Sequence, residues 1–390
     1  MRILLTGGDS GGHIYPLISV AEQLKIISDQ KRIPMEIIYL GCPGNFEFVL
    51  VSNGVRISKL ISAKRRRYSD IRNIFTLPRL LLGIIQAFWK VFWIMPDVLF
   101  SKGGTGSVPV VLACKFYRIP IIIHESDSIA GFSNLFSSKY ADRIAIGFEK
   151  TAESFADHYE KEQDKGDVLA KIALVGNPIR NFLLKEGDIN RQVAKKIFEF
   201  NPEKPLILVL GGSQGAMRIN DFFVNIGKEL VSGGLQILLQ TGINNFDEIK
   251  SEWKLTADTL PDDLKFAFRI AAYFNDDIKD AYAAADLIVS RAGSGSIFEV
   301  AAAGKPAILL PLSKEIAGEH QIKNAYEYAD KGAAIVIEDE NLKPHLFIDQ
   351  INRLFQNPEL LKLMSLAAKN FSKPQAAQTI AEEIIRLGNL

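Results

Sequence analysis

The chain has 390 residues, which is too long for one ordinary domain and predicts two domains of similar size. Apolar residues make up 47% of it, enough for sizeable cores, and the formal net charge of +1 excludes a protein that binds nucleic acid mainly by neutralising phosphates. The two cysteines, Cys42 and Cys114, have no metal-type spacing and no disulfide framework, which suits a reducing cytoplasm.

The first residues, MRILLTGG, lead directly into a strand and a glycine turn, so we expect no signal peptide. The longest apolar run, residues 80–95, is interrupted by Gln86 and Lys90 and is too short to span a membrane. We therefore expect a soluble protein that can still bind a membrane surface.

Short apolar strands alternate with longer mixed or amphipathic segments, which is typical of βαβ units and parallel sheets. The first half predicts strands at residues 2–6, 36–40, 97–100, 120–124, 143–146 and 172–175. The second half predicts strands at residues 205–210, 235–240, 287–290, 307–310 and 333–337. The polar stretch 160–167 predicts a surface loop, and residues 358–387 predict helix.

Each half begins with an apolar strand that runs into a glycine turn, at residues 3–12 and again at 206–215. A turn signal at Gly176-Asn177-Pro178 places the boundary near residue 180, giving domains 1–180 and 181–371, and a final helix at about 372–390 can pack back on the first domain. Because ligands of open parallel sheets bind outside the carboxyl ends of the strands, two such sheets facing each other would leave a ligand cleft. The expected fold is thus α/β, with two Rossmann-like parallel-sheet domains across a cleft, as in GT-B glycosyltransferases.

The strongest site signal lies at residues 285–325, where a buried strand enters the turn Arg291–Ser296 and then a helix that carries Glu299. Backbone N–H groups at a helix start form an anion site, and a carboxylate further along suits a ribose diol. The alternative for Glu299 is a charge that only complements the helix dipole. Ser213, in GGSQGA, predicts a second phosphate-facing turn, although it can also cap the helix that starts near Ala216.

The first turn, Gly7–Gly12, has neither the dinucleotide-binding spacing nor a Walker lysine, yet it is richer in glycine than a tight turn requires. We interpret it as a site where a ligand or diphosphate approaches the backbone closely. His13 follows it and either contacts substrate and moves a proton or is only a packed ring. The acidic pairs 262–263 and 276–277 predict helix caps rather than metal ligands, so we expect no obligatory metal.

Basic residues 64–67 precede a segment, 71–95, with more aromatic side chains than one modest helix face needs to bury. Basic residues beside apolar ones suit an anionic membrane surface, and core packing is the alternative. The predicted membrane patch consists of Arg65, Arg66, Arg67, Phe75, Arg79, Trp89 and Trp93.

Over residues 2–385 the sequence resembles the MurG family, peptidoglycan enzymes that add N-acetylglucosamine (GlcNAc) to a lipid-linked muramyl peptide. The segments that carry this resemblance are GGDSGGHIYPLISVA, HESDSIAGFSN, VGNPIR, LVLGGSQGAMRIN, RAGSGSIFEVAAAGKPAILLPL and HQIKNA. The resemblance implies an inverting, metal-independent transferase without a cofactor, which moves GlcNAc from UDP-GlcNAc to an undecaprenyl-linked muramoyl-pentapeptide (lipid I to lipid II). It also implies a peripheral location on the cytoplasmic side of the membrane.

The resemblance assigns roles to individual residues. His13 would serve as the catalytic base, with Glu125 and Asp9 as reserves. The backbone at Asn275 would meet the uracil, and Glu299 would bind the ribose hydroxyls. The remaining donor-site residues would be Ser10, Gly11, Gly12, Asp127, Arg180, Ser213, Ser294, Gly295, Ser296, His320 and Gln321.

The chain departs from the family pattern at Asp9, where glycine is common, and at Ser126 and Asp127, where glutamine and asparagine are usual. Thr105 and Val108 alter the family's G-G-Y-x-S-G-P loop. Asp127 bears on the N-acetyl group of the donor. Three other functions remain open: a transferase acting on another lipid such as diacylglycerol, a UDP-GlcNAc epimerase, and a silent membrane scaffold that binds UDP-sugar.

Overall fold

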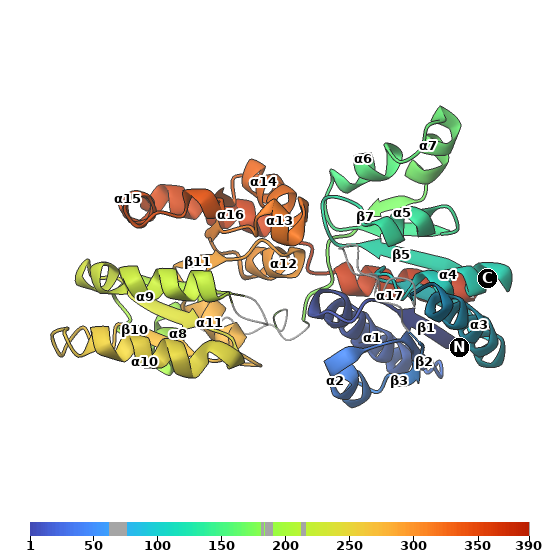
Figure 1. Cartoon of the computed structure of the whole chain (residues 1–390), viewed down its shortest axis with the longest axis horizontal. Coiled ribbons are helices and arrows are strands. Elements are labelled where there is room, and N and C mark those ends of the chain that lie inside the picture. Colours follow the sequence, from blue (N-terminus) through green and yellow to red (C-terminus); the bar gives the residue numbers. More distant parts are fainter. Residues whose placement is uncertain (62–75, 181–182, 184–189, 212–215, 390) are drawn as a thin grey trace. The chain divides into compact units, whose positions relative to one another are not determined.

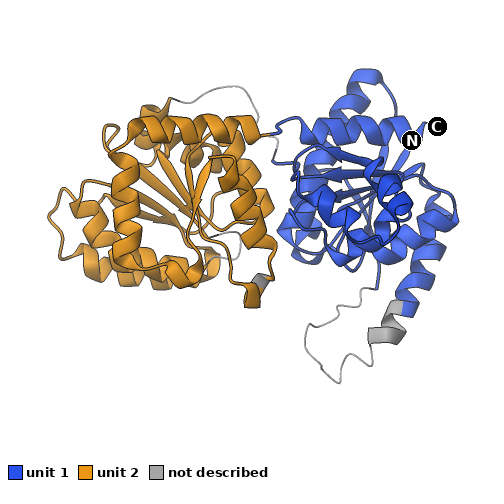
Figure 2. Cartoon of the chain, turned by 90° about the horizontal axis from the view of Figure 1, so that it is seen from above, with its two compact units in different colours: residues 1–181, 373–390 blue, residues 182–372 orange. Residues whose placement is uncertain are grey.

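The computed structural model describes residues 1–61, 76–180, 183, 190–211 and 216–389. The chain divides into two compact units, and each is described by itself (Figure 2). Unit 1 consists of Met1–Asn181 together with Lys373–Leu390, and unit 2 consists of Phe182–Ser372.

Unit 1 is built on a parallel sheet of seven strands in the order β3-β2-β1-β4-β5-β6-β7 (Figure 1). The strands are β1 (Arg2–Thr6), β2 (Glu36–Gly41), β3 (Arg56–Lys59), β4 (Val98–Ser101), β5 (Ile121–Glu125), β6 (Arg143–Ile146) and β7 (Ile172–Leu174). The helices are α1 (Gly11–Lys31), α2 (Glu47–Ser52), α3 (Thr76–Ile94), α4 (Val108–Phe116), α5 (Phe132–Ser138), α6 (Thr151–Ala156), α7 (Glu162–Leu169) and α17 (Ala376–Gly388).

Unit 2 has a parallel sheet of six strands in the order β10-β9-β8-β11-β12-β13. The strands are β8 (Leu206–Leu210), β9 (Gln236–Gln240), β10 (Phe268–Ala271), β11 (Leu287–Ser290), β12 (Ala307–Leu309) and β13 (Ala334–Val336). The α-helices are α8 (Arg191–Ile197), α9 (Met217–Ser232), α10 (Phe246–Ala257), α11 (Ile278–Ala284), α12 (Ser294–Ala303), α13 (Lys314–Ala317), α14 (His320–Asp330), α15 (Pro344–Phe355) and α16 (Pro358–Phe371).

The α/β fold with two Rossmann-like parallel sheets is confirmed, and the eleven predicted strands all form. Two further strands, β3 and β10, escaped prediction, and both lie at the edge of a sheet. The sequence prediction was wrong at 160–167, where most of the polar residues belong to α7. It was also wrong at Asp262, which precedes no helix and instead pairs with Lys265 at 2.6 Å.

The last helix of the chain, α17, packs onto unit 1. α17 packs against α1, and its inner face contributes Ile380, Ile384 and Leu387 to the core that also contains Leu5 of β1. Its alternation of buried and exposed residues is that of an amphipathic helix. Residues far apart in sequence therefore build one core, which also includes side chains of β1 and β4.

We expect Ile384→Ala to lower the free energy of unfolding by about 2–5 kcal/mol, because Ile384 is fully buried and its loss leaves a cavity. Urea unfolding measures this difference, with Thr379→Ala on the exposed side of the same helix as the control. Equal midpoints for the two variants would contradict the packing of α17 into unit 1.

Candidate functional site

The turn between β1 and α1 brings backbone and polar groups together at the carboxyl edge of the unit 1 sheet. Ser10 is the N-cap residue of α1, and its hydroxyl lies 2.7 Å from Nδ1 of His13 instead of capping the helix. A Cβ on Gly104 would come within 2.9 Å of the Gly8 backbone and 3.6 Å of Nε2 of His13. Gly104 has φ of +84°, so glycine is needed here both for the turn and for the space beside the ring.

The surroundings of His13 favour its neutral form. Burial and then the charge of Lys102 lower its pKa, Asp127 and Asp9 act in the opposite direction, and the net pKa is about 4. A neutral imidazole can accept a proton at pH 7, which an imidazolium cannot. The position and the charge environment of His13 therefore suit a general base.

Glu125, the first reserve for the base, is fully engaged within the protein. One carboxylate oxygen accepts hydrogen bonds from Gly131 N–H and Asn134 Nδ2, both at 2.9 Å, and the other accepts from Asp127 N–H at 3.1 Å. Burial and the neighbouring Asp127 raise its pKa, while these hydrogen bonds lower it. This geometry favours a role in holding the loop after β5.

The other predicted residues of unit 1 come from loops at the same sheet edge. Asp9 precedes the N-cap of α1, and Asp127 follows β5, where its carbonyl accepts a hydrogen bond from Thr151. Arg180 lies beyond β7, and its guanidinium is 6.0 Å from the centre of the Tyr15 ring on α1. The structure thus gathers Asp9, Ser10, Gly11, Gly12, His13, Asp127 and Arg180 on loops at the carboxyl ends of three strands and at the start of one helix.

In unit 2 the start of α12 has the geometry expected of an anion site. Gly293 is its N-cap residue, and Ser294, Gly295 and Ser296 supply the first-turn N–H groups, which have no partner within the helix. A Cβ added to Gly293 or Gly295 would meet no atom within 4 Å. The space before this helix end is open, so a phosphate can approach the N–H groups.

Glu299 lies on α12 one turn beyond Gly295 and Ser296, which places the three residues on one face of the helix. Its Oε2 accepts a hydrogen bond from the hydroxyl of Tyr282 on α11 at 3.2 Å. Tyr282 is buried, so this hydrogen bond fixes the orientation of the Glu299 carboxylate from the protein interior. Glu299 is therefore placed to receive further donors, as a diol would provide.

Asn275 is exposed in the turn between β10 and α11, and its backbone N–H donates to Asp277 Oδ1 at 2.7 Å. Asp277 is the N-cap residue of α11, as the capping prediction requires, but the structure shows no capping hydrogen bond from its side chain to the helix.

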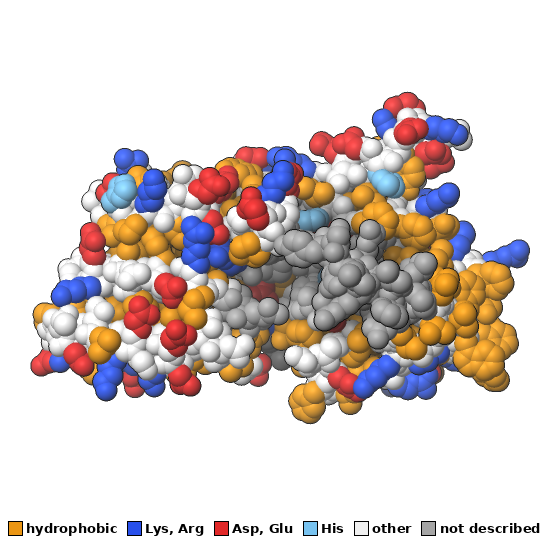
Figure 3. Space-filling view, in the orientation of Figure 1, with side chains coloured by type: hydrophobic (Ala, Val, Ile, Leu, Met, Phe, Trp, Pro, Cys, Tyr) orange, Lys and Arg blue, Asp and Glu red, His pale blue; other side chains and the backbone are white. Residues whose placement is uncertain are grey.

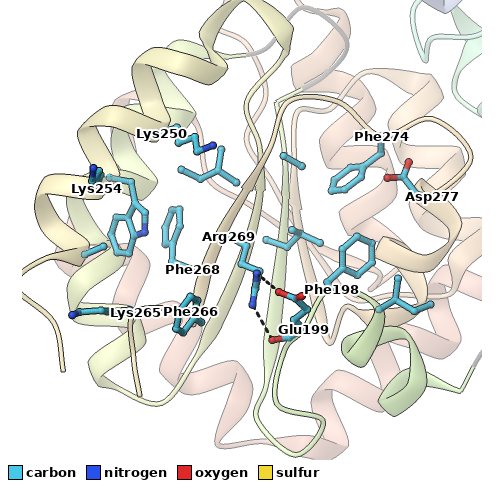
Figure 4. Close-up of a pocket in the computed structure, with 16 residues that line it drawn as sticks. Phe198, Glu199, Lys250, Lys254, Lys265, Phe266, Phe268, Arg269, Phe274 and Asp277 are labelled. Carbon is cyan, nitrogen blue, oxygen red and sulfur yellow. Dashed lines mark hydrogen bonds and ion pairs between the residues drawn. The ribbon is translucent and has the colours of Figure 1, made fainter. Parts of the chain in front are cut away.

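Beside this turn an open groove of about 620 Å³ runs along the edge strand β10 (Figure 4). Arg269 points into the groove and pairs with Glu199 at 2.8 Å.

His320 and Gln321 begin α14, which packs against α12. The side-chain oxygen of Gln321 accepts from Leu312 N–H at 3.0 Å and ties α14 to the loop after β12. Ser213 lies outside the described residues. Among the residues that the structure does describe, no group of three or more His, Cys, Asp or Glu side chains could hold a metal ion.

A buried ion pair that sequence reasoning missed supports the unit 2 site. Arg291, the first residue after β11, is paired with Asp339 at 2.9 Å and donates to the carbonyl of Leu310 at 3.0 Å. Asn324 of α14 donates to the carbonyl of Ala292 at 3.4 Å. These contacts join the segments that follow β11, β12 and β13 and fix the residue that precedes the α12 cap. The charge of Arg291, directly after an apolar strand, was the one sign of this ion pair in the sequence. Its partner Asp339 is too distant in the sequence to be predicted.

Two residues of the predicted membrane patch, Trp89 and Trp93, lie on α3 and are exposed. Trp89 and Trp93 are 64% and 65% exposed, and their neighbours Ile85 and Phe92 are exposed too, whereas Ala87 and Val91 are buried against the unit. Figure 3 shows hydrophobic side chains gathered where Figure 1 labels α3. Arg65, Arg66, Arg67 and Phe75 lie outside the described residues, and the side chain of Arg79 is not described. No helix in the described ranges is long and apolar enough to cross a membrane.

Comparisons with known proteins identify the family. Residues 3–146 match the glycosyltransferase family 28 N-terminal domain, and residues 206–380 match the corresponding C-terminal domain. Two relatives, from Alkaliphilus metalliredigens and Bacillus cereus, are named UDP-N-acetylglucosamine–N-acetylmuramyl-(pentapeptide) pyrophosphoryl-undecaprenol N-acetylglucosamine transferase. The first is 33% identical over 388 residues (99% of each chain), and the second is 32% identical over 384 residues, covering 98% of this chain and 99% of the relative. The chain belongs to the MurG family.

Solved structures agree with the fold. The crystal structure of Acinetobacter baumannii MurG has a TM-score of 0.72 at 23% identity and 99% coverage of both chains. A UDP-GlcNAc 2-epimerase from Neisseria meningitidis, solved with UDP-GlcNAc, has a TM-score of 0.66 at 12% identity, covering 99% of this chain and 100% of its own. At these identities both likenesses show the shared fold alone.

We expect Asp339→Asn to lower the free energy of unfolding by about 3–5 kcal/mol, because Arg291 would keep a buried charge without its partner. Denaturant unfolding of the variant measures this, with the exposed neighbour in Glu340→Gln as the control. A variant as stable as the wild type would show that the pair does not hold these loops.

Proposed function

We propose that this protein transfers GlcNAc from UDP-GlcNAc to an undecaprenyl-linked muramoyl-pentapeptide, converting lipid I to lipid II in peptidoglycan synthesis. The observation that carries the proposal is the full-length similarity to relatives that are named for this transfer. The geometry of α12 supports it, since one helix offers amides for a diphosphate and a carboxylate for a ribose.

Unit 2 would bind the donor nucleotide. The N–H groups of Ser294, Gly295 and Ser296 would meet the diphosphate, Glu299 would accept hydrogen bonds from the ribose hydroxyls, and the β10–α11 turn at Asn275 would contact the uracil. The N–H of Asn275 already donates to Asp277, so a uracil contact there uses the carbonyl or requires this turn to open. Ser213, His320 and Gln321 complete the proposed set in unit 2.

Unit 1 would bind the acceptor and contribute Ser10, Gly11, Gly12, Asp127 and Arg180 to the sugar and diphosphate of the donor. In a single displacement, the acceptor hydroxyl oxygen bonds to C1 of GlcNAc as the bond from C1 to the β-phosphate oxygen breaks. UDP leaves with the electron pair, and the hydroxyl proton passes to His13. The anomeric centre inverts to a β-linkage.

We assign stabilisation of the departing UDP to backbone N–H groups, Ser213 and Arg180 rather than to a metal ion. The low pKa of His13 in the unliganded protein supports its role as base, because the imidazole starts without a proton. An anionic ligand beside the ring would raise this pKa and make His13 a stronger base when substrate is bound.

A transfer assay tests the function directly. Radiolabelled UDP-GlcNAc is offered with a short-chain muramyl-peptide pyrophosphoryl lipid, and we expect labelled disaccharide lipid to form in the presence of EDTA. His13→Ala is expected to lower kcat by about 10²–10⁴-fold, the usual contribution of a general base. Label moving to diacylglycerol instead, or an epimerised sugar nucleotide as the product, would overturn the proposal, and full activity of His13→Ala would remove the residue from the mechanism.

We infer that the protein binds peripherally at the cytoplasmic side of the membrane, and the exposed aromatic face of α3 supports contact with a membrane surface. Phe116, on α4, is 68% exposed, and its ring packs 5.3 Å from Phe88 of α3. The exposed Lys115 and Arg118 lie on either side of Phe116 in the sequence. Aromatic side chains beside cations suit the interface of an anionic bilayer.

We expect the double variant Trp89→Glu/Trp93→Glu to bind vesicles of anionic lipid more than about tenfold more weakly, because two apolar anchors become repelling charges. Vesicle co-sedimentation measures the partition. The control is Leu363→Glu/Leu366→Glu on α16, which adds the same charge at side chains 64% and 56% exposed in unit 2. Equal weakening by both pairs would show that α3 has no special role.

A further inference from the structure

A buried lysine ties together three loops of the unit 1 site. Lys102 is the first residue after β4 and is only 3% exposed. Its ammonium group donates to Nδ1 of His124 at 2.6 Å, to the hydroxyl of Ser126, and to Oδ1 of Asn177 at 3.2 Å. His124 ends β5, Ser126 follows it, and Asn177 lies beyond β7.

The hydrogen bonds around Lys102 fit a protonated amine. Nε2 of His124 donates to the carbonyl of Gly176 at 2.8 Å, which leaves Nδ1 of the neutral ring as an acceptor. The hydroxyl of Ser126 donates to Oδ1 of Asn177 at 3.2 Å, so its lone pairs face Lys102. Three acceptors therefore surround the three N–H bonds of one ammonium group.

The carboxylates near this cluster are Glu125 and Asp127. Both raise the pKa of Lys102, whereas burial lowers it by more, to about 7. Neither carboxylate has a hydrogen bond to Lys102 among the described contacts. Neutral groups thus bind the ammonium group of Lys102, and the nearby carboxylates of Glu125 and Asp127 balance its charge.

The cluster touches the proposed base through the first glycine turn. A Cβ on Gly7 would lie 3.4 Å from Cβ of Lys102 and 3.5 Å from Cβ of His13, so both side chains begin next to Gly7. The charged groups that act on His13 are Lys102 from the loop after β4, Asp127 from the loop after β5, and Asp9 from its own turn. Lys102 is the cation among them.

We propose that Lys102 is a positioning residue for glycosyl transfer, whose buried ammonium group fixes the loops that carry Asp127 and Arg180 beside the turn that carries His13. This inference rests on the proposed function. Arg180 follows Asn177 by three residues, so the contact between Lys102 and Asn177 anchors the segment that brings Arg180 to α1. The ammonium group is buried and acts through other residues.

The sign of the charge effect follows from the groups around His13. Replacing Lys102 with methionine removes the cation that lowers the pKa of His13 and leaves Asp9 and Asp127, which raise it. The pKa of His13 therefore rises in Lys102→Met, and the acid limb of the kcat profile moves to higher pH. A substitution that only loosened the loops would lower kcat at every pH without moving this limb.

The first measurement needs no substrate. We expect NMR titration of ring-labelled histidines, with His13 assigned from His13→Gln, to show its pKa rising in Lys102→Met relative to the wild type. The matched control is Lys195→Met, which removes another buried lysine (2% exposed). Lys195 belongs to unit 2 and pairs at 2.7 Å with Asp286, the residue that precedes β11 at the amino end of the strands. The control is expected to leave the titration of His13 unchanged.

The second measurement is the transfer assay. We expect Lys102→Met to lower kcat by about 10²-fold, as a small misplacement of reacting groups does, and to shift the acid limb upward. Ser126→Ala keeps the charge but removes a partner of Lys102, so its kcat falls while the acid limb stays in place. This variant also tests the inference if Lys102→Met does not fold.

An unchanged His13 titration in folded Lys102→Met, or wild-type kcat in either variant, would overturn the inference. A wild-type protein that shows no GlcNAc transfer would instead refute the proposed function, and the titration would still test the effect of Lys102 on His13.

Discussion

A parallel sheet directs the carboxyl end of every strand to one edge, and this constraint organises both units. The backbone leaves each buried strand at that edge and must find partners for its polar groups as it turns toward a helix. Helix starts with unpaired N–H groups gather there as well. The topology of the sheet therefore determines where residues such as His13 after β1 and Ser294 after β11 lie, whatever their side chains are.

The loops at these edges are held by buried polar contacts between segments distant in sequence. In unit 2 the pair of Arg291 and Asp339 joins three loops, and in unit 1 Lys102 does the same with neutral acceptors. A buried charge is costly unless it is well bonded, so these clusters favour one arrangement of the loops over others. In our proposal, this arrangement presents a helix end and a few side chains to an anionic ligand.

The sequence was sufficient for the central strands, because runs such as Leu206–Leu210 are apolar throughout and end in glycine turns. It failed for β3 and β10, which are only four residues long and mix apolar residues with charged or polar ones, so neither forms a continuous apolar run. The positions of the glycine turns, His13 and Glu299 in the fold were predictable, because a strand, a turn and a helix start are local patterns. Lys102, Asn177 and Asp339 were not, since their partners lie up to 75 residues away and only the folded chain brings them together.

The central claim is that main-chain amides at the start of α12 bind the diphosphate of the donor. Amide chemical shifts recorded during titration with UDP-GlcNAc test it most directly. The account predicts that the largest changes fall on Ser294, Gly295 and Ser296. Changes confined to the groove along β10, with these three amides unmoved, would contradict it.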